Sequence, residues 1–353
     1  MKIAVIPHPG ITFERMFSQW SPFFEEKICQ SNSYMLKKEL EKRNIELVPM
    51  ERLEKGESCD AILHFSPFQF EILKRYSDIR HIYIAAEPPV VLPMHSEFGD
   101  KLLVKYVFDS VIATNHQAVA PNIFPVIWPK DFPKELPPKR KILWEEKKLA
   151  CMFAANKFAL GKHELYTARR RIIKCFEENA SDQFDLYGAG WPKELSVYRG
   201  YAEDKYETSQ QYRFSICLSN VAHIKGILDE KIFDAMIVGT VPVYQGIDEI
   251  EEYVPAGCFI DYRKFSTPLE CLQYLRKMTR QEYEQYQRNI HDFISSEKTR
   301  TKFSAVNAAN AVENACRLSE QKKKRKIYVF QLLELYNKIY NKVCEYEKMK
   351  GSF

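Results

Sequence analysis

The stretch that decides the fold is Tyr212–Gly246, YRFSICLSNVAHIKGILDEKIFDAMIVGTVPVYQG. It begins with an apolar, strand-like run that breaks into a polar loop at Ser219-Asn220, and Val241–Tyr244 has the pattern of a second buried strand. A short helix is predicted between them, because apolar residues recur at the spacing of one buried helical face, namely Ile232, Ala235 and Met236. Strand, loop, helix and strand in this order predict one βαβ unit. Such units bind ligands at the carboxyl ends of strands and the amino ends of helices.

The predicted helix has recognisable ends and two charged residues in its first turn. Asp229 is a good N-cap, and Gly239 stands where a helix usually ends. Glu230 and Lys231 follow the cap, where free backbone N–H groups and the helix dipole favour an anion. A lysine there can hold a diphosphate, and a glutamate can accept a hydrogen bond from a sugar hydroxyl. An ordinary surface pair at the start of a helix fits the same residues, and the pattern alone favours that interpretation.

The segment resembles the donor-binding signature of glycosyltransferase family 10, the α-1,3/4-fucosyltransferases. That signature is roughly Phe-Glu-Asn, a loop, Thr-Glu-Lys, and a helix closed by Gly-x-Val-Pro-Val. The matching residues here are Asn220, Glu230, Lys231, Gly239, Val241, Pro242, Val243 and Gly246. Ser219 replaces the usual acid, Asp229 replaces the usual threonine, and the loop is longer. Asp229 keeps the capping role but adds a negative charge near the expected phosphate.

The resemblance implies the α/β fold called GT-B, in which two Rossmann-like domains face a cleft. It implies an inverting, metal-independent transfer of L-fucose from GDP-fucose to a hydroxyl of a glycan acceptor, of the surface polysaccharide or lipopolysaccharide type. In this interpretation Lys231 binds the diphosphate, Glu230 holds the ribose and Asn220 supports the loop. No cofactor is implied besides the donor. No Asp-x-Asp occurs in the sequence, so a metal-clamped sugar nucleotide site has no support there.

The N-terminal part alternates short apolar runs with helical patterns. Candidate strands are Ile3–Ile6, Ile45–Val48, Ala61–Phe65, His81–Ala86 and Val111–Ala113. This alternation predicts an open, mostly parallel sheet wrapped by helices. No Gly-x-Gly-x-x-Gly follows the first strand, so a nicotinamide-cofactor domain is not expected.

Glu87 stands at the carboxyl end of the predicted strand His81–Ala86, and two prolines after it end the strand and stiffen the turn. A carboxylate that faces a cleft beside apolar neighbours has its pKa raised toward the range of a general base. A glutamate that only caps a turn fits the position equally well. Family 10 enzymes carry a glutamate at this point, thought to deprotonate the acceptor hydroxyl, so the resemblance makes Glu87 the catalytic candidate. His95 and Glu97 follow on the same loop and are expected to be solvated or to contact the acceptor.

In the C-terminal part, Leu149–Ala155 is the predicted first strand of a second sheet, and a helix is predicted from about His163 to Asn179. Four basic residues on the helix are interpreted as a solvated face and not as a phosphate site: Arg169, Arg170, Arg171 and Lys174. The segments LYTARRR, FDLYGAGW and YRGYAEDKYETSQQYRF resemble the first half of the family 10 donor domain. Family members use a basic residue of the last segment against the diphosphate. Arg199 is the nearest candidate here, and Lys205 competes with it.

Four regions are predicted: an N-terminal acceptor-binding Rossmann-like domain (1–128), a proline-rich linker (129–148), a C-terminal nucleotide-sugar domain (149–318) and a basic amphipathic tail (319–353). The likeness to the family covers residues 149–312 and, in the first half, only the surroundings of Glu87. After Gly246 a strand is predicted at Phe259–Asp261, with a helix from Thr267 and another over Gln281–Phe293.

The tail begins with the basic cluster Lys322–Lys326, KKKRK, and continues as a helical pattern to Lys350. One broad apolar stripe is predicted on this helix: Val329, Leu332, Leu333, Tyr336, Ile339, Tyr340 and Val343. A basic cluster before an amphipathic helix suits a reversible contact with an anionic membrane through residues 322–350. The resemblance favours this contact, because bacterial family members often carry such a tail. A helix that docks on the N-terminal domain or pairs with another subunit fits the same pattern.

The composition sets wide limits. A chain of 353 residues with 45% hydrophobic content is long enough for two domains. Its net charge of +5 is too weak to predict nucleic-acid binding. The nine cysteines occur singly, without Cys-x-x-Cys, which favours reduced thiols in a cytosolic protein. The strand-like start Met1–Ile6 is too short for a signal peptide or an anchor. Because animal family members carry an anchor at this end, we expect a bacterial-type, cytoplasmic enzyme, peripheral on the inner face of the membrane.

Two other functions stay open. Ser219 and Asp229 leave room for a GT-B glycosyltransferase that uses a different nucleotide sugar. A non-enzymatic module of the same fold, binding glycan or membrane through its tail, would show no nucleotide-stimulated sugar transfer.

Overall fold

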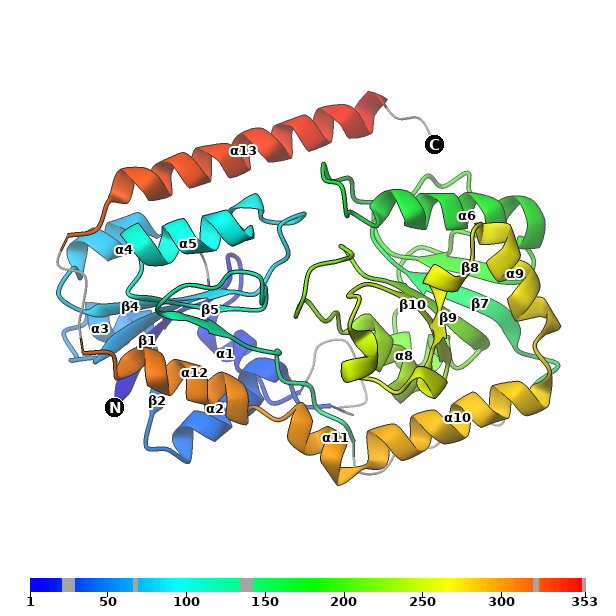
Figure 1. Cartoon of the computed structure of the whole chain (residues 1–353), viewed down its shortest axis with the longest axis horizontal. Helices are drawn as coiled ribbons and strands as arrows, with labels where there is room; N and C mark the ends of the chain where they lie inside the picture. The colour runs from blue at the N-terminus through cyan, green and yellow to red at the C-terminus, as the bar shows by residue number, and fades with distance from the viewer. Residues whose placement is uncertain (21–28, 66–68, 134–141, 320–323, 351–353) are drawn as a thin grey trace.

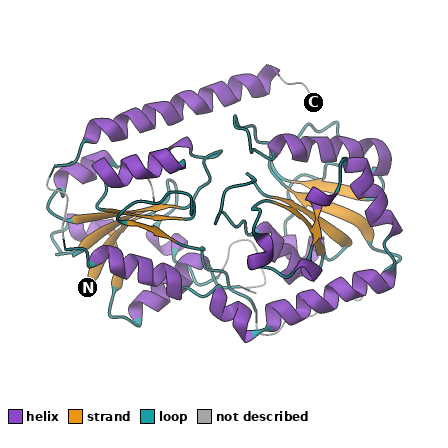
Figure 2. Cartoon of the chain, in the orientation of Figure 1, coloured by secondary structure: helices purple, strands orange, loops and turns teal. Residues whose placement is uncertain are grey.

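The chain forms two α/β domains, which are the left and right halves of Figure 1. The computed structural model describes residues 1–20, 29–65, 69–133, 142–319 and 324–350. Each half is built around one parallel sheet with helices on both faces, as the colouring in Figure 2 shows. Such sheets bury both faces, which is why their strands are almost continuous apolar runs.

The first sheet has six strands in the order β2-β1-β3-β4-β5-β6, and all neighbouring pairs are parallel. Its strands are β1 (Lys2–Ile6), β2 (Glu46–Pro49), β3 (Ala61–His64), β4 (Arg80–Ala85), β5 (Ser110–Ala113) and β6 (Ile123–Pro125). The helices around it are α1 (Phe13–Met16), α2 (Asn32–Glu41), α3 (Met50–Glu54), α4 (Phe70–Arg75), the 3-10 turn η1 (Pro93–His95) and α5 (Glu97–Tyr106). Every strand predicted in this half is present, and β6 is an additional edge strand.

Both faces of this sheet are covered because successive side chains of a strand point to opposite sides. Ile3 and Val5 of β1 lie in one core cluster, whereas Ala4 and Ile6 lie in another on the opposite face. The alternation explains how a short, mostly apolar strand can support helices on both sides of the sheet.

The second sheet has five strands in the order β11-β10-β9-β7-β8, again all parallel. Its strands are β7 (Lys148–Phe153), β8 (Phe184–Tyr187), β9 (Tyr212–Leu218), β10 (Val241–Gln245) and β11 (Ile260–Asp261). The helices and 3-10 turns around it are α6 (Tyr166–Ala180), α7 (Lys205–Ser209), α8 (Lys231–Val238), η2 (Ile250–Glu252), η3 (Ala256–Cys258), η4 (Tyr262–Lys264), α9 (Pro268–Lys277) and α10 (Arg280–Ser295). The predicted βαβ unit is β9, α8 and β10.

In both sheets the strand that comes first in the chain lies between the second and the third, so the strand order reverses beside it. Ligands of doubly wound sheets bind outside the carboxyl ends of the strands at this reversal. In the second domain the reversal lies between β7 and β9. The loops that follow Phe153 and Leu218 are therefore the expected position of a ligand.

The chain crosses between the domains more than once. Phe132, just before the part of the predicted linker (134–141) that lies outside the described residues, packs against Phe233 and Phe303 in the core of the second domain. Farther on, α10 leads through α11 (Glu297–Lys302) to α12 (Val306–Cys316), which returns to the first sheet (Figure 1).

The alanines of α12 let this helix approach the first sheet closely, with Ala308, Ala309 and Val312 in the same core cluster as β1. Residues 306–316 were assigned to the donor domain by the predicted boundary at 318. In the structure they lie with the first domain, because the face that they bury belongs to that domain's core.

The last helix, α13 (Ile327–Lys350), lies across both domains (Figure 1). Near its start Phe330 is fully buried against Phe108 of the first domain. Farther along, the Tyr340 hydroxyl donates to the Leu160 carbonyl at 2.7 Å and accepts from the Leu160 N–H at 3.0 Å in the second domain. The predicted single stripe is therefore divided between two faces. Leu333 and Tyr340 face the protein, whereas four members are exposed: Leu332, Tyr336, Ile339 and Val343.

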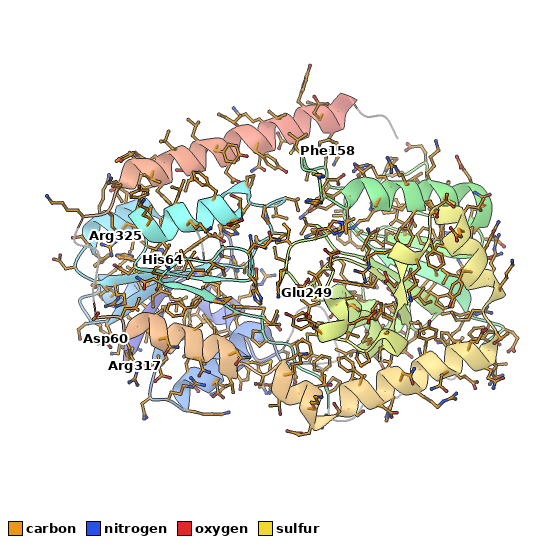
Figure 3. The ribbon with its side chains drawn as sticks, viewed as in Figure 1. Asp60, His64, Phe158, Glu249, Arg317 and Arg325 are labelled. Carbon is orange, nitrogen blue, oxygen red and sulfur yellow. The ribbon has the colours of Figure 1, made fainter. Side chains whose placement is uncertain are left out.

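A buried ion pair anchors the segment before α13. Arg325 Nη2 lies 2.6 Å from Asp109 Oδ2, both side chains are almost inaccessible to solvent, and Arg325 Nη1 donates to the Ser77 carbonyl at 2.8 Å. Figure 3 shows Arg325 at the start of this helix, over the first domain. Arg325 belongs to the predicted basic cluster, of which Lys322 and Lys323 lie outside the described residues. At least this member of the cluster binds protein and is not free to contact a lipid headgroup.

Candidate active site

The first turn of α8 is where the signature residues gather. The helix begins at Lys231 with Glu230 as its N-cap, although the sequence predicted Asp229 in that position. Asp229 nevertheless does the capping chemistry, since its carboxylate accepts from the Lys231 backbone N–H at 2.8 Å and from the Lys231 ammonium at 2.7 Å. At the other end, Gly239 closes the helix with a φ of 86°, as the sequence predicted.

Lys231 is held as a cation in this turn. Its side chain is 21% exposed, and the Glu230 carboxylate lies 3.6 Å from its ammonium. Burial alone lowers the pKa of Lys231, but the carboxylates of Asp229 and Glu230 outweigh it and raise the pKa above the ordinary value. A fixed positive charge at the amino end of a helix is the arrangement that binds a phosphate.

Arg169 of α6 holds the loop between β9 and α8 through hydrogen bonds. Arg169 is 3% exposed. It donates to the Leu218 carbonyl through Nε at 3.2 Å and Nη2 at 2.6 Å, and through Nη2 to Asn220 Oδ1 at 2.9 Å. The prediction that this basic face is solvated is therefore wrong for Arg169. Asn220, predicted to support the loop, is the residue that this guanidinium holds.

Periodicity could have identified Arg169. It lies four residues after Leu165 and three before Ile172, both of which were predicted on the buried stripe of the helix. A charged residue in phase with a buried stripe needs polar partners inside the protein, and the free carbonyl at the end of a strand is such a partner.

Glu87 follows β4 at the surface between the two domains. Its side chain is exposed, yet protein surrounds it on several sides, and this partial loss of water raises the pKa of its carboxyl above the ordinary value. Lys157 is the strongest charge acting on it and lowers the pKa, Glu230 and Asp229 raise it, and Lys231 lowers it. The Glu87 carboxyl therefore lies within electrostatic range of the first turn of α8, and its neighbour Ala86 lines one pocket together with Glu230.

Lys157 was not singled out by the sequence, although it lies in the loop after β7, where the strand order reverses. It is exposed, and it makes no ion pair with the residues that the structure describes. Its position at a reversal point was the signal that could have identified it.

His95 departs from the prediction that it is solvated or contacts the acceptor. It is 2% exposed, its Nδ1 lies 2.8 Å from the Glu87 carbonyl, and its Nε2 lies 2.6 Å from the Tyr83 hydroxyl. Burial lowers the pKa of His95 to about 4. Glu97, in contrast, is exposed at the start of α5 and pairs with Lys101 at 2.7 Å.

The two domains touch beside this site. Val90, three residues after Glu87, packs with Tyr166 and Val221 of the second domain in a small apolar cluster. The His116 N–H donates to the Lys225 carbonyl at 2.9 Å. Gly226 has a φ of +86°, and a Cβ there would lie 2.6 Å from the Thr114 carbonyl oxygen, so this contact requires glycine.

A pocket of about 140 Å³, which we call the cleft pocket, opens next to this contact. Both domains line it, with Ala86 and Thr114 from the first and Glu230 and Phe233 from the second. Glu230, which is half exposed, therefore faces a space between the domains, where it can accept a hydrogen bond from a ligand.

Arg199 is not among the residues gathered at α8. Its Nε lies 2.7 Å from Asp185 Oδ1 on β8, and its Nη1 donates to the Ser196 carbonyl at 2.6 Å. Lys205, its competitor, pairs with Asp234 at 2.8 Å and lines a small pocket together with Lys231. In the described part of the chain no three His, Cys, Asp or Glu side chains form a group that could hold a metal ion.

A sequence profile described as glycosyltransferase family 10 (fucosyltransferase), C-terminal part, matches residues 144–336, which is more than half of the chain. This chain belongs to glycosyltransferase family 10. The matched range contains Asn220, Glu230 and Lys231, whereas Glu87 lies outside it. The resemblance inferred from the sequence of the βαβ unit is thereby confirmed.

Curated relatives of this family 10 chain carry fucosyltransferase names. The 4-galactosyl-N-acetylglucosaminide 3-alpha-L-fucosyltransferase 9 of Rattus norvegicus is 25% identical over 204 residues, which are 56% of this chain and 48% of that protein. The alpha-(1,4)-fucosyltransferase of Arabidopsis thaliana is 31% identical over 67 residues, which are 19% of this chain and 16% of that protein. The chain therefore matches about half, or less, of the length of these relatives.

Solved structures with the same architecture include an alpha1,3-fucosyltransferase with GDP-fucose, with a TM-score of 0.51, 14% identity and 91% of both chains covered. Anabaena HepE in complex with UDP and glucose has a TM-score of 0.53 at 13% identity, covering 89% of this chain and 98% of that chain. At this level of identity the likeness concerns the fold. It confirms the predicted GT-B arrangement of two Rossmann-like domains.

Proposed function

We propose that this chain is an inverting, metal-independent fucosyltransferase that moves L-fucose from GDP-fucose to a hydroxyl of a glycan acceptor, of the surface polysaccharide or lipopolysaccharide type. The observation that carries the proposal is that, in a family 10 chain, the residue before Glu87 lines one pocket with Glu230 and the charges of Glu230 and Lys231 act on the Glu87 carboxyl. The names of the curated relatives support the choice of fucose.

The donor is bound from the second domain. Lys231 and the free N–H groups of α8 bind the diphosphate, Glu230 accepts a hydrogen bond from the ribose, and Asn220 keeps the loop in place. The charge of a leaving diphosphate increases as its bond to the sugar breaks, so a fixed cation and a helix amino end stabilise the transition state more than the ground state.

The acceptor reacts from the side of Glu87. Its hydroxyl oxygen forms a bond to C1 of fucose while the Glu87 carboxylate takes the hydroxyl proton. The bond between C1 and the diphosphate oxygen breaks on the opposite face, and its electron pair leaves with GDP. Because the sugar passes through an oxocarbenium-like state with attack and departure on opposite faces, the configuration at C1 is inverted.

Two substitutions test these roles. Glu87→Gln should lose most of the turnover while keeping its affinity for GDP, because it removes the base and leaves α8 intact. Glu97→Gln, at an exposed glutamate ten residues later, is the matched control.

Lys231→Ala should weaken GDP binding in calorimetric titration, whereas Lys225→Ala should not. An unchanged GDP titration for Lys231→Ala would count against the assignment, and loss of transfer in EDTA would count against metal independence.

The second candidate function is a transferase that uses a different nucleotide sugar as donor, and the charge of Asp229 supports it. The Asp229 carboxylate, 2.7 Å from the Lys231 ammonium, adds a negative charge where family members carry a threonine. Thermal-shift measurements with GDP, UDP, ADP and CMP separate the two candidates, because only the nucleotide of the true donor should stabilise the protein strongly.

A non-enzymatic module of the same fold is the third candidate. Incubation with radiolabelled GDP-fucose and a panel of glycan acceptors decides this point. Transfer of label to any acceptor excludes the module, whereas tight glycan binding without transfer supports it.

We further propose that the outer face of α13 contacts an anionic membrane, at the inner, cytoplasmic side. No helix in the described residues is long and apolar enough to cross a bilayer. The outer face of α13 nevertheless exposes large apolar side chains, namely Leu332, Leu335, Tyr336, Ile339, Val343 and Met349. Exposed lysines flank them, so the face can enter a lipid interface while the inner face stays docked. Co-sedimentation of Leu332→Ser/Ile339→Ser with phosphatidylserine vesicles tests this, and binding equal to wild type would contradict it.

A further inference from the structure

A second pocket lies under the C-terminal half of α13. Its volume is about 360 Å³, at the lower end of the range of about 300–1,000 Å³ for small-molecule sites. Four segments form its walls: the turn after Glu87, the loop after β7, the start of α6 at Tyr166, and the inner face of α13. Figure 3 places Phe158, at the tip of that loop, directly beneath the helix. We call this space the helix pocket.

The wall that α13 supplies is fixed by hydrogen bonds to the second domain. The Tyr340 hydroxyl makes two hydrogen bonds to the Leu160 backbone, at 2.7 and 3.0 Å. About two turns further on, the Lys348 ammonium donates to the Asn156 carbonyl at 2.8 Å. Between these two contacts Cys344 is 7% exposed. The helix is therefore hydrogen-bonded to the loop after β7 at two points, and these contacts fix the position of the side chains between them.

The lining of the helix pocket combines aromatic rings with hydrogen-bonding side chains. Phe158, Tyr166 and Tyr340 supply ring surfaces, and Asn341, Glu345 and Lys157 supply an amide, a carboxylate and an ammonium. Glu345 makes no ion pair with any residue that the structure describes. A pyranose presents a face of C–H groups and a rim of hydroxyls. Its faces fit aromatic rings, and its hydroxyls both donate and accept hydrogen bonds.

The helix pocket lies beside the turn that follows Glu87. Val90 lines it and lies three residues after Glu87, and Lys157 lines it and is the strongest charge acting on the Glu87 carboxyl. Tyr166, which also lines it, is influenced by the charges of both Lys231 and Glu87. No residue between Asn220 and Lys231 lines it. A molecule in this pocket would therefore lie beside the turn that carries Glu87.

We propose that the helix pocket is an acceptor-sugar subsite, and that Asn341 and Glu345 of α13 hydrogen-bond a sugar unit of the glycan whose hydroxyl reacts at Glu87. The C-terminal helix is then a determinant of acceptor specificity in addition to any contact with a membrane. This inference rests on the fucosyltransferase function proposed above.

The test compares Asn341→Ala/Glu345→Gln with Lys342→Ala, an exposed residue between them that does not line the pocket. Both changed side chains of the double variant are exposed and lie within a helix, so the fold is preserved, and thermal denaturation checks this. The probe is a 4-galactosyl-N-acetylglucosaminide disaccharide, together with the acceptor of the panel that the wild-type chain uses best. The KM for acceptor, the KM for GDP-fucose and the hydrolysis of GDP-fucose without acceptor are measured separately.

We expect the acceptor KM of the double variant to rise about fivefold to tenfold, as the loss of one or two hydrogen bonds predicts. The KM for GDP-fucose and the hydrolysis rate should match wild type, and Lys342→Ala should match wild type in all three. An unchanged acceptor KM, or a rise confined to the KM for GDP-fucose, overturns the subsite while leaving the proposed function intact. Absence of fucose transfer by wild type would instead overturn the proposed function and this inference with it.

Discussion

His95 donates its Nδ1–H to the backbone carbonyl of Glu87 at 2.8 Å and so connects the candidate base to the core of the first domain. Burial lowers the pKa of His95 to about 4, so the ring is neutral near pH 7 and carries one proton. A carbonyl can only accept, which places that proton on Nδ1, and Nε2 then accepts from the Tyr83 hydroxyl at 2.6 Å. His95 is therefore a positioning residue that holds the turn of Glu87.

Substitution of His95 tests this positioning role. His95→Leu should lower kcat about tenfold, equal to ~1.4 kcal/mol, because Glu87 moves away from the reacting hydroxyl. The KM for GDP-fucose should not change. His95→Asn keeps an N–H donor near the position of Nδ1 and should recover part of the lost kcat. Thermal denaturation should show both variants less stable than wild type, and an equal loss of kcat in both would argue for a purely structural role.

The pH dependence of transfer should report the pKa of Glu87. A general base works when ionised, so kcat/KM rises with pH through the pKa of the base. Partial burial raises the pKa of Glu87 above 4.5, and Lys157 is the strongest opposing charge. Lys157→Met should therefore raise this pKa further and move the acidic limb of the kcat/KM profile to higher pH. Lys162→Met changes an exposed lysine of the same loop and should leave the acidic limb in place. A limb that moves to lower pH in Lys157→Met would contradict the assignment of Glu87 as the base.

Much of the second domain could be predicted from its sequence. Buried parallel strands are short apolar runs, and the helix between β9 and β10 is marked by Asp229 and Gly239 at its ends. Local chemistry decides such features, so one stretch of chain was enough. The position of Glu87 after β4 could likewise be predicted, because residues at the carboxyl ends of parallel strands meet at one edge of the sheet.

Contacts between distant parts of the chain could not be predicted in the same way. An apolar stripe shows that a helix is covered on one face but not which domain covers it. For that reason α12 was assigned to the wrong core, and α13 was given one stripe where it has two faces. The sequence places His95 only in a loop, and its hydrogen bond to the Tyr83 hydroxyl becomes evident only in the folded structure. Arg169 was hidden within a run of basic residues, most of which are indeed partly or fully exposed.

Asp229 should weaken the binding of a diphosphate, because its carboxylate already pairs with the Lys231 ammonium at 2.7 Å. Asp229→Thr keeps an oxygen that can accept from the Lys231 N–H and removes the negative charge. We expect calorimetric titration to show GDP binding about three- to tenfold tighter, since about 1 kcal/mol is typical of one nearby charge. In a Lys231→Ala background the same change should have a much smaller effect, because the paired cation is gone. Weaker GDP binding by Asp229→Thr alone would show instead that the carboxylate is needed to orient Lys231.

The ion pair of Arg325 and Asp109 should be worth more to stability than any exposed pair of the chain, because loss of one partner leaves a buried charge. Arg325→Met should lower the free energy of unfolding by about 3–5 kcal/mol and increase hydrogen exchange along α13, which begins two residues after Arg325. Arg317→Met is the matched control, since Arg317 is 67% exposed and pairs only across one helical turn with Glu313, a contact worth about 0.3–0.5 kcal/mol.

The double variant Asp109→Asn/Arg325→Met should recover part of the loss, because it removes the uncompensated carboxylate. Urea denaturation of the four proteins measures these differences. If Arg325→Met and Arg317→Met lower the unfolding free energy equally, α13 is held by its apolar contacts around Phe330 and not by this ion pair.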